Sequence, residues 1–209
     1  MSDNVIAAIQ CRMSSTRLPG KVLRLIEGVP TIGRIVQRLS YSQRLGGIIV
    51  ACSENPADDR IAAYCSQNRI AYVRGSETAV DQRLLLAADA TGADAIVRVT
   101  ADCPLVDPAL LDTLVGMWVA STPGIPMPPD YVSTVYPNRT SPAGLDLAVI
   151  SRSASACQRA GTVPPARLFR DAHRTVQQTA LPSPRFDHHA AELGERGDAG
   201  CLPLACLGL

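Results

Sequence analysis

The sequence predicts an α/β protein in which helices cover both faces of a mostly parallel β-sheet. Over the first 120 residues, short apolar segments alternate with longer segments in which apolar residues recur at helical spacing. The apolar segments are continuous rather than alternating, which is typical of strands buried on both faces. A length of 209 residues, with 46% hydrophobic against 19% charged residues, suits a globular domain with its own core.

The expected elements follow one another along the chain. Strands are expected at residues 5–9, 48–51, 70–73 and 95–99, and helices at residues 31–45, 56–68, about 80–90 and about 109–119. The first helix follows Pro30 and carries Ile32, Ile35 and Leu39 on one stripe. The second has two aspartates in its first turn, which suit the helix dipole. Asp107 is placed to cap the last helix.

Composition excludes several classes of protein. A formal net charge of +1 gives no reason to expect nucleic acid as a partner. No apolar run is long enough to cross a membrane, and the N-terminus lacks the pattern of a signal peptide. The seven cysteines are odd in number and include no Cys-x-x-Cys pair, which argues against a disulfide framework. We therefore expect a cytoplasmic protein that binds neither nucleic acid nor membranes.

A basic loop follows the first strand, in the stretch QCRMSSTRLPGKVL at residues 10–23. Ligands bind at the carboxyl ends of parallel strands, and such a loop can direct cations and N–H groups at phosphate oxygens. The loop lacks the Ser or Thr of a Walker A motif and the glycines of a dinucleotide fingerprint. It combines positive charge, hydroxyl donors and a tight turn, supplied by Arg12, Arg17 and Lys21, by Ser14, Ser15 and Thr16, and by Pro19 with Gly20. We expect a phosphate site, with a solvated basic turn as the alternative interpretation.

A second candidate lies in the stretch VRVTADCPLVDP at residues 97–108, where Asp102 directly follows a strand. A carboxylate at this edge of the sheet, across from a phosphate loop, is what a magnesium-nucleotide site needs. Asp107 serves better as a helix cap, whereas Asp102 has no comparable structural role. Asp102 is therefore the expected metal ligand.

Together these stretches resemble the cytidylyltransferases that activate acidic sugars, including the 3-deoxy-manno-octulosonate and acylneuraminate enzymes. The spore-coat polysaccharide branch is the most similar. The resemblance rests on the two stretches above, on VACSENPADD and VRGSE at residues 50–59 and 73–77, and on DYVS and GLDL at residues 130–133 and 144–147. These motifs occur in the family's order and cover about the first 150 residues.

The resemblance implies a Rossmann-like α/β/α nucleotidyltransferase domain with a mostly parallel, mixed sheet. It also implies Mg²⁺ as cofactor and transfer of CMP from CTP to an acidic sugar, with release of pyrophosphate, for polysaccharide or glycan biosynthesis. The implied catalytic residues are Arg12, Lys21 and Asp102, of which Asp102 holds the metal. The implied nucleotide-binding residues are Gln10, Arg12, Ser15, Thr16, Arg17, Gly20, Lys21, Arg74 and Ser76. The implied substrate residues are Glu77, Arg83 and Asp146, with a second metal contact as the alternative for Asp146.

The sequence also departs from the family pattern. Gln82 stands where the similar branch usually carries Asp, and Ala148 where it usually carries Glu. In the motif around residue 82, only Arg83 matches the family. After about residue 161, the family's Arg-Glu-His element and Asp-Thr-x-x-Asp close are replaced by a stretch rich in Pro, Gly and Arg without apolar periodicity. We therefore expect a nucleotidyltransferase domain at residues 1–160 and a divergent, irregular tail at 161–209. Our hypothesis is that this tail is divergent or results from a frame change, and lacks the second metal carboxylate.

Three functions remain open at this level. The first is an active cytidylyltransferase. The second is a catalytically impaired homologue that binds a nucleotide or a protein partner without turnover, and the third is a nucleotidyltransferase with another base preference. Similar enzymes are commonly homodimers, and residues 123–129 and 131–136 are candidates for the dimer arm, with a plain surface excursion as the alternative.

Overall fold

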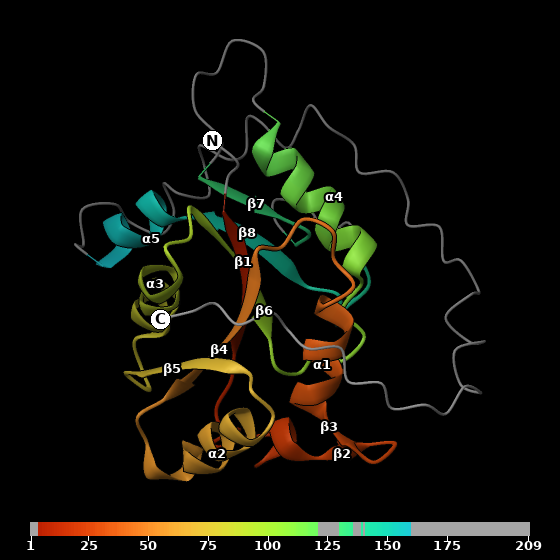
Figure 1. Cartoon of the computed structure of the whole chain (residues 1–209), viewed down its shortest axis with the longest axis vertical. Coiled ribbons are helices and arrows are strands. Elements are labelled where there is room, and N and C mark those ends of the chain that lie inside the picture. The colour runs from red at the N-terminus through yellow and green to blue at the C-terminus, as the bar shows by residue number, and fades with distance from the viewer. Residues whose placement is uncertain (1–3, 121–129, 136–138, 140, 160–209) are drawn as a thin grey trace.

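A mixed β-sheet forms the centre of the protein, as the computed structural model shows for residues 4–120, 130–135, 139 and 141–159 (Figure 1). The sheet order is β5-β4-β1-β6-β8-β7. The first four strands of this order are parallel, whereas β8 runs antiparallel to β6, and β7 antiparallel to β8. The strands are β1 (Val5–Gln10), β4 (Gly47–Ser53), β5 (Ala71–Gly75), β6 (Ala95–Thr100), β7 (Tyr131–Ser133) and β8 (Leu147–Ser151). The predicted mostly parallel, mixed sheet is confirmed.

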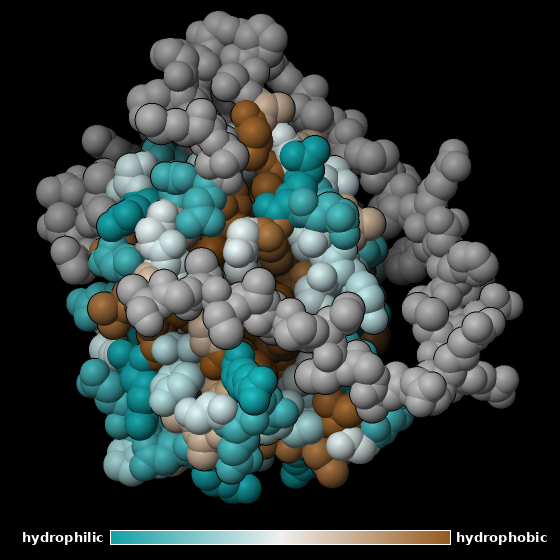
Figure 2. Space-filling model, viewed as in Figure 1, coloured by the Kyte–Doolittle hydropathy of each residue, from teal (hydrophilic) through white to brown (hydrophobic). Residues whose placement is uncertain are grey.

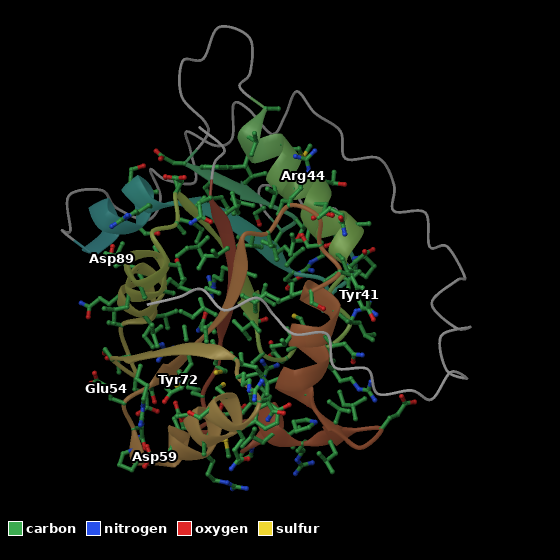
Figure 3. All side chains as sticks on the ribbon, in the orientation of Figure 1. Tyr41, Arg44, Glu54, Asp59, Tyr72 and Asp89 are labelled. Atoms are coloured by element: carbon green, nitrogen blue, oxygen red, sulfur yellow. The ribbon has the colours of Figure 1, made fainter. Side chains whose placement is uncertain are left out.

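Helices cover both faces of this sheet, as predicted. Alternate residues of β1 point to opposite faces, so that Ile9 packs in one apolar cluster and Ile6 in the other. The cluster around Ile9 includes α1 (Thr31–Leu39), α2 (Asp59–Gln67) and α4 (Pro108–Val119), and the cluster around Ile6 includes α3 (Val80–Thr91). The last helix of the described residues, α5 (Arg152–Arg159), lies beside α3 (Figure 1). Its Arg152 pairs at 2.7 Å with Asp89 of α3, which Figure 3 labels. The result is a three-layer α/β/α arrangement.

The surface reflects this layering. In Figure 2, a central band of hydrophobic residues is bordered on both sides by hydrophilic ones. Many of the charged residues that face solvent lie in the loops and turns between the strands and helices. No helix in the described ranges is both long enough and apolar enough to span a bilayer.

The first helix is shorter than expected and ends at Leu39 rather than at residue 45. Beyond it, Asp112 of α4 accepts hydrogen bonds from the Ser42 hydroxyl at 2.5 Å and from the Gln43 N–H at 3.0 Å. These contacts compete with the helical hydrogen bonds that the backbone would otherwise make. The sequence pattern could not reveal them, because Asp112 lies about 70 residues further along the chain.

Other small elements also depart from the expected pattern. A short hairpin joins β2 (Leu25–Ile26) to β3 (Val29–Pro30), and its two turn residues, Glu27 and Gly28, both have positive φ. The expected helix at 56–68 begins as a short 3₁₀ segment (Pro56–Asp58), which the Asn55 side chain caps by accepting a hydrogen bond from the Ala57 N–H. The predictions for residues 123–129 and for the tail at 161–209 lie outside the described residues.

Three cysteines of the core should resist alkylation in the folded protein. Burial raises the pKa of Cys11, Cys52 and Cys65, that of Cys65 to about 12, and the thiolate is the reactive form. After treatment with iodoacetamide at pH 8, peptide mapping should find all three unmodified in the native protein and modified in urea. Rapid modification of native Cys52 would contradict the packing of α2 on the sheet.

Candidate active site

A pocket of about 190 Å³ lies at the carboxyl ends of β1 and β6. The loop after β1 and the loop after β6 form it, because these two strands are parallel neighbours and end at the same edge of the sheet. Seven of the predicted site residues line it: Gln10, Arg12, Ser15, Thr16, Arg17, Lys21 and Asp102. Stretches about 80 residues apart in the sequence therefore meet in one site.

Lys21 and Asp102 form an ion pair across this pocket. The Lys21 Nζ lies 2.6 Å from Asp102 Oδ2, and the exposed fractions of the two side chains are 26% and 41%. Partial burial raises the pKa of Asp102, whereas hydrogen bonds from the Lys21 ammonium and the Thr100 hydroxyl lower it. The lowering effects are together the larger, so the pKa of Asp102 lies below its ordinary value. Asp102 is therefore a charged carboxylate at neutral pH, available to a cation.

Positive charge is in excess around the pocket. In the described part of the chain, no carboxylate lies within ion-pair distance of the exposed Arg12 or Arg17. Among the lining residues, Lys21 is balanced by Asp102, so Arg12 and Arg17 give the pocket lining an excess of positive charge. Glu77, outside the lining, lies close enough to interact electrostatically with Arg12. Such a site attracts a multiply charged anion, and a guanidinium can bind phosphate through two hydrogen bonds.

The loop after β1 owes its shape to a few backbone contacts. The Met13 carbonyl accepts hydrogen bonds from the Ser15 N–H at 2.9 Å and from the Gly20 N–H at 3.0 Å. Gly20 has a φ of +69°, in the left-handed region that glycine adopts without strain. This conformation directs the chain into the short 3₁₀ segment (Lys21–Leu23) that carries Lys21.

Replacing Gly20 by Ala should cost about 1 kcal/mol of stability and also weaken nucleotide binding. The backbone cost follows from the positive φ, which a Cβ disfavours. Gly92, at the end of α3, has a φ of +62° and provides a matched control away from the pocket. Urea unfolding should show similar losses for Gly20→Ala and Gly92→Ala, whereas calorimetry should show weakened nucleotide binding only for Gly20→Ala. Equal affinities would mean that the turn at Gly20 does not shape the site.

The structure places the other predicted residues outside the pocket lining. Arg74 pairs with Asp59 at 2.7 Å, and the Ser76 hydroxyl accepts a hydrogen bond from the Ala79 N–H at the start of α3. Asp146 pairs with Arg139 at 2.5 Å, in the loop before β8. The side chains of Arg74, Ser76 and Asp146 thus contact other parts of the protein rather than line the pocket.

Glu77 belongs to the loop between β5 and α3, and Arg83 lies in the first turns of α3. Arg83 is 1% exposed, and its Nη1 donates to the carbonyls of Ser76 and Glu77 at 2.9 and 3.2 Å. The Glu77 carboxylate extends to the loop after β1, where it accepts a hydrogen bond from the Ser14 hydroxyl at 2.5 Å. Ser14 is thus connected to a second loop of the site.

Asp58 was missed as a site residue by reasoning from the sequence. It follows Asn55 at the start of a helical segment, where acidic residues usually face solvent. In the structure it is 1% exposed and accepts a hydrogen bond from the Met13 N–H at 2.7 Å. No pattern in the sequence distinguishes it from the neighbouring, exposed Asp59.

One of the departures from the family pattern can be located on the sheet. Ala148 lies opposite Arg98 in the register of β6 and β8. Arg98 donates from Nε to the Gln10 side chain at 3.1 Å, and no carboxylate of the described residues pairs with it. The Ala148 side therefore offers Arg98 no acidic partner.

Among the residues that line the pocket, Asp102 is the carboxylate that could bind a metal ion. Within the described ranges, no group of three or more His, Cys, Asp or Glu side chains could hold a metal ion. Magnesium typically takes only one or two carboxylates and completes its shell with water and substrate phosphates. Asp102, in a pocket lined with cations for those phosphates, fits this mode of binding.

Comparison with known proteins gives consistent relatives. The family model described as cytidylyltransferase matches residues 6–140. The spore coat polysaccharide biosynthesis protein SpsF of Bacillus subtilis is 35% identical over 117 residues, which cover 54% of this chain and 49% of that protein. The 3-deoxy-manno-octulosonate cytidylyltransferase of Geobacter sulfurreducens is 31% identical over 124 residues, covering 59% of this chain and 48% of that protein.

A solved structure shows the same arrangement. A cytidylyltransferase from Leptospira borgpetersenii matches with a TM-score of 0.69 at 29% identity, over 80% of this chain and 68% of that one. The chain spans about half the length of the curated relatives that it matches.

Proposed function

Because the chain belongs to the cytidylyltransferase family, we propose that it transfers CMP from CTP to a hydroxyl group of an acidic sugar. The observation that carries this proposal is the pocket that Arg12, Arg17, Lys21 and Asp102 line together, with Lys21 paired to the Asp102 carboxylate. Relatives named as 3-deoxy-manno-octulosonate cytidylyltransferases and as a spore coat polysaccharide biosynthesis protein support an acidic sugar and a role in polysaccharide synthesis.

In this reaction, the sugar hydroxyl oxygen forms a bond to the α-phosphorus of CTP, the bond to the bridging oxygen breaks, and pyrophosphate leaves. Positioning and neutralisation of charge contribute most of the catalysis in phosphoryl transfer. Arg12, Arg17 and Lys21 would neutralise the triphosphate, and Ser15 and Thr16 would donate hydrogen bonds to it. The pocket is smaller than the roughly 300–1,000 Å³ of whole-ligand sites, which suits the phosphate part of the nucleotide.

Magnesium is the proposed cofactor, with Asp102 as its protein ligand. When bound, it would withdraw charge from the phosphate oxygens and so favour attack at the α-phosphorus. In the structure, Asp102 neutralises Lys21 at 2.6 Å. Once Asp102 is engaged by a cation, Lys21 loses its partner and can bind a phosphate oxygen instead.

The test is a pyrophosphate-release assay with CTP and magnesium. The acceptors are 3-deoxy-manno-octulosonate and N-acetylneuraminate, with glucose as a neutral control. Release that depends on an acidic acceptor supports the proposal. Tight CTP binding without product from either acid would favour the catalytically impaired homologue, a function to which the missing acidic partner of Arg98 also points.

A further inference from the structure

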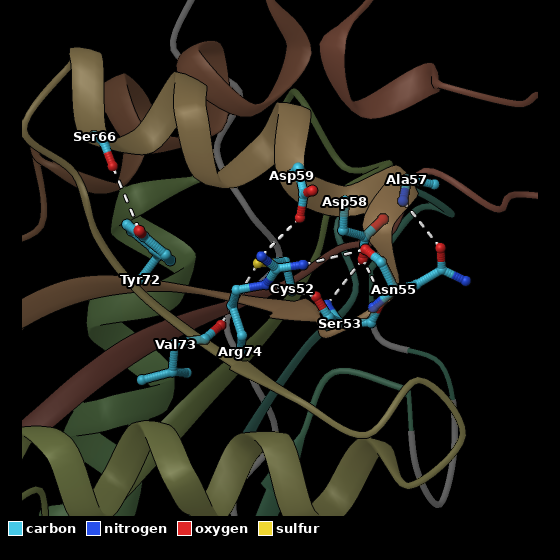
Figure 4. Close-up of polar contacts among 10 residues, drawn as sticks. All are labelled: Cys52, Ser53, Asn55, Ala57, Asp58, Asp59, Ser66, Tyr72, Val73 and Arg74. Carbon is cyan, nitrogen blue, oxygen red and sulfur yellow. Dashed lines mark hydrogen bonds and ion pairs between the residues drawn. The ribbon is translucent and has the colours of Figure 1, made fainter.

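Two carboxylates hold the loop after β1 from outside the pocket. Asp58, in the segment between β4 and α2, accepts a hydrogen bond from the Met13 N–H at 2.7 Å through Oδ1. Its Oδ2 accepts from the Ser53 N–H at 2.8 Å and from the Ser53 hydroxyl at 2.5 Å, so the carboxylate is fixed at the end of β4 (Figure 4). Asp58 is 1% exposed and does not line the pocket.

Met13 makes the backbone hydrogen bonds that connect the parts of this loop. Its N–H donates to Asp58, while its carbonyl accepts from the N–H groups of Ser15 and Gly20. Those two residues lie on either side of the pocket-lining Thr16 and Arg17. The backbone on both sides of the Met13 Cα is therefore hydrogen-bonded, which ties both arms of the loop to this residue.

Glu77 provides a second attachment, at the next residue of the loop. Its Oε1 accepts from the Ser14 hydroxyl at 2.5 Å, and its Oε2 accepts from the Asn55 amide at 2.9 Å. The Glu77 backbone is held in turn by the buried Arg83.

Asn55 is also anchored. Its carbonyl accepts from Arg74 Nη2 at 3.2 Å, and Arg74 Nε donates to the Ser53 carbonyl at 3.0 Å (Figure 4). Both carboxylates are therefore attached to a braced segment and can act as fixed points for the loop.

We propose that Asp58 and Glu77 are positioning residues that hold the loop of residues 11–20 in its phosphate-binding conformation without contacting the nucleotide. The proposal rests on the proposed function, in which this loop binds the triphosphate. The loop has no regular secondary structure before residue 21, so its ordering would otherwise oppose binding. A loop ordered beforehand presents Arg12, Ser15 and Thr16 without that cost.

Glu77 could affect anion binding through its charge or through its hydrogen bond to Ser14, and these two roles predict opposite effects of removing it. If Glu77 acted only through its charge, its removal would strengthen the binding of an anion to this site. If it acts by holding Ser14, its removal should weaken binding. Loss of a hydrogen bond to a charged group corresponds to roughly a tenfold rise in Kd.

The experiment is a double-mutant cycle on Ser14 and Glu77, with Kd for CTP and magnesium measured by calorimetry. Ser14→Ala and Glu77→Ala should each raise Kd about tenfold. The double variant should bind no more weakly than Glu77→Ala, because Glu77→Ala has already lost the contact with Ser14 along with that to Asn55. Glu54→Ala removes the same charge from an exposed residue nearby and should leave Kd unchanged (Figure 3). Unchanged or tighter binding by Glu77→Ala, or additive losses in the double variant, would overturn the proposal.

Asp58 is tested against its neighbour. Asp58→Asn and Asp59→Asn make the same change in charge, but only the first removes an acceptor from the Met13 and Ser53 region. Asp58→Asn should raise Kd about tenfold and Asp59→Asn less than twofold. Equal effects would overturn the role of Asp58.

A measurement without ligand separates this proposal from the proposed function. Hydrogen exchange should show faster exchange at Met13, Ser15 and Gly20 in Glu77→Ala and Asp58→Asn than in the wild type, with exchange in the core strand β6 unchanged. Failure of the wild type to bind CTP would refute the proposed function. The hydrogen-exchange rates would then be the test of whether Asp58 and Glu77 hold the loop. Unchanged exchange in both variants would overturn it.

Discussion

Replacing Asp102 by Asn should lower magnesium-dependent transfer of CMP by roughly a thousandfold. Asp102 is the carboxylate among the residues that line the pocket, so its loss removes the protein ligand proposed for the metal. The fold should persist, because the side chain is 41% exposed and its ion pair with Lys21 contributes at most about 1 kcal/mol. Pyrophosphate release measures the effect, and urea unfolding confirms that the variant is folded.

A matched control is available in the same loop. Asp107 accepts hydrogen bonds from the N–H groups of Ala109 and Leu110 as the N-cap of α4, and Asn caps helices about as well as Asp. Asp107→Asn should therefore keep both stability and activity. If Asp102→Asn retained more than about a tenth of the wild-type rate, Asp102 would not be the metal ligand.

Replacing Arg83 by Ala should lower the free energy of unfolding by about 3 kcal/mol. Arg83 is among the largest fully buried side chains, and its guanidinium holds two carbonyl groups of the loop between β5 and α3. The Ala variant loses both the packing and the hydrogen bonds. Urea unfolding followed by circular dichroism measures the loss.

Arg83→Met separates the two contributions. Met keeps most of the volume and removes a buried charge whose Nε has no hydrogen-bond partner in the described structure, so its loss of stability should be about 1 kcal/mol. Equal losses in the Ala and Met variants would show that the hydrogen bonds, rather than the packing, stabilise this loop.

The central strands and most helices could be predicted from the sequence because their signals are local. The continuous apolar run of β1 and the spacing of Ile32 and Ile35 in α1 are properties of neighbouring residues. The end of α1 could not be predicted, because Asp112, a distant residue, competes for the backbone and side chain beyond Leu39. The strand β7 is only three residues long and gives no pattern of its own.

The same distinction applies to the site. The loop at residues 10–23 and Asp102 were found because each directly follows a strand, and neighbouring parallel strands end at one edge of the sheet. Asp58 was missed because its role depends on a buried contact with Met13, 45 residues away. The contacts of Arg74 and Glu77 with the segment between β4 and α2 likewise exist only in the folded chain.

Calorimetric titration with CTP, UTP, GTP and ATP, each with and without magnesium, tests the account most directly. A site formed by Arg12, Arg17, Lys21 and Asp102 in a cytidylyltransferase should bind CTP in preference to the other nucleotides. Magnesium should strengthen this binding, and the strengthening should be absent in Asp102→Asn. Binding that is equal for all four nucleotides, or absent for CTP, would contradict the proposed function.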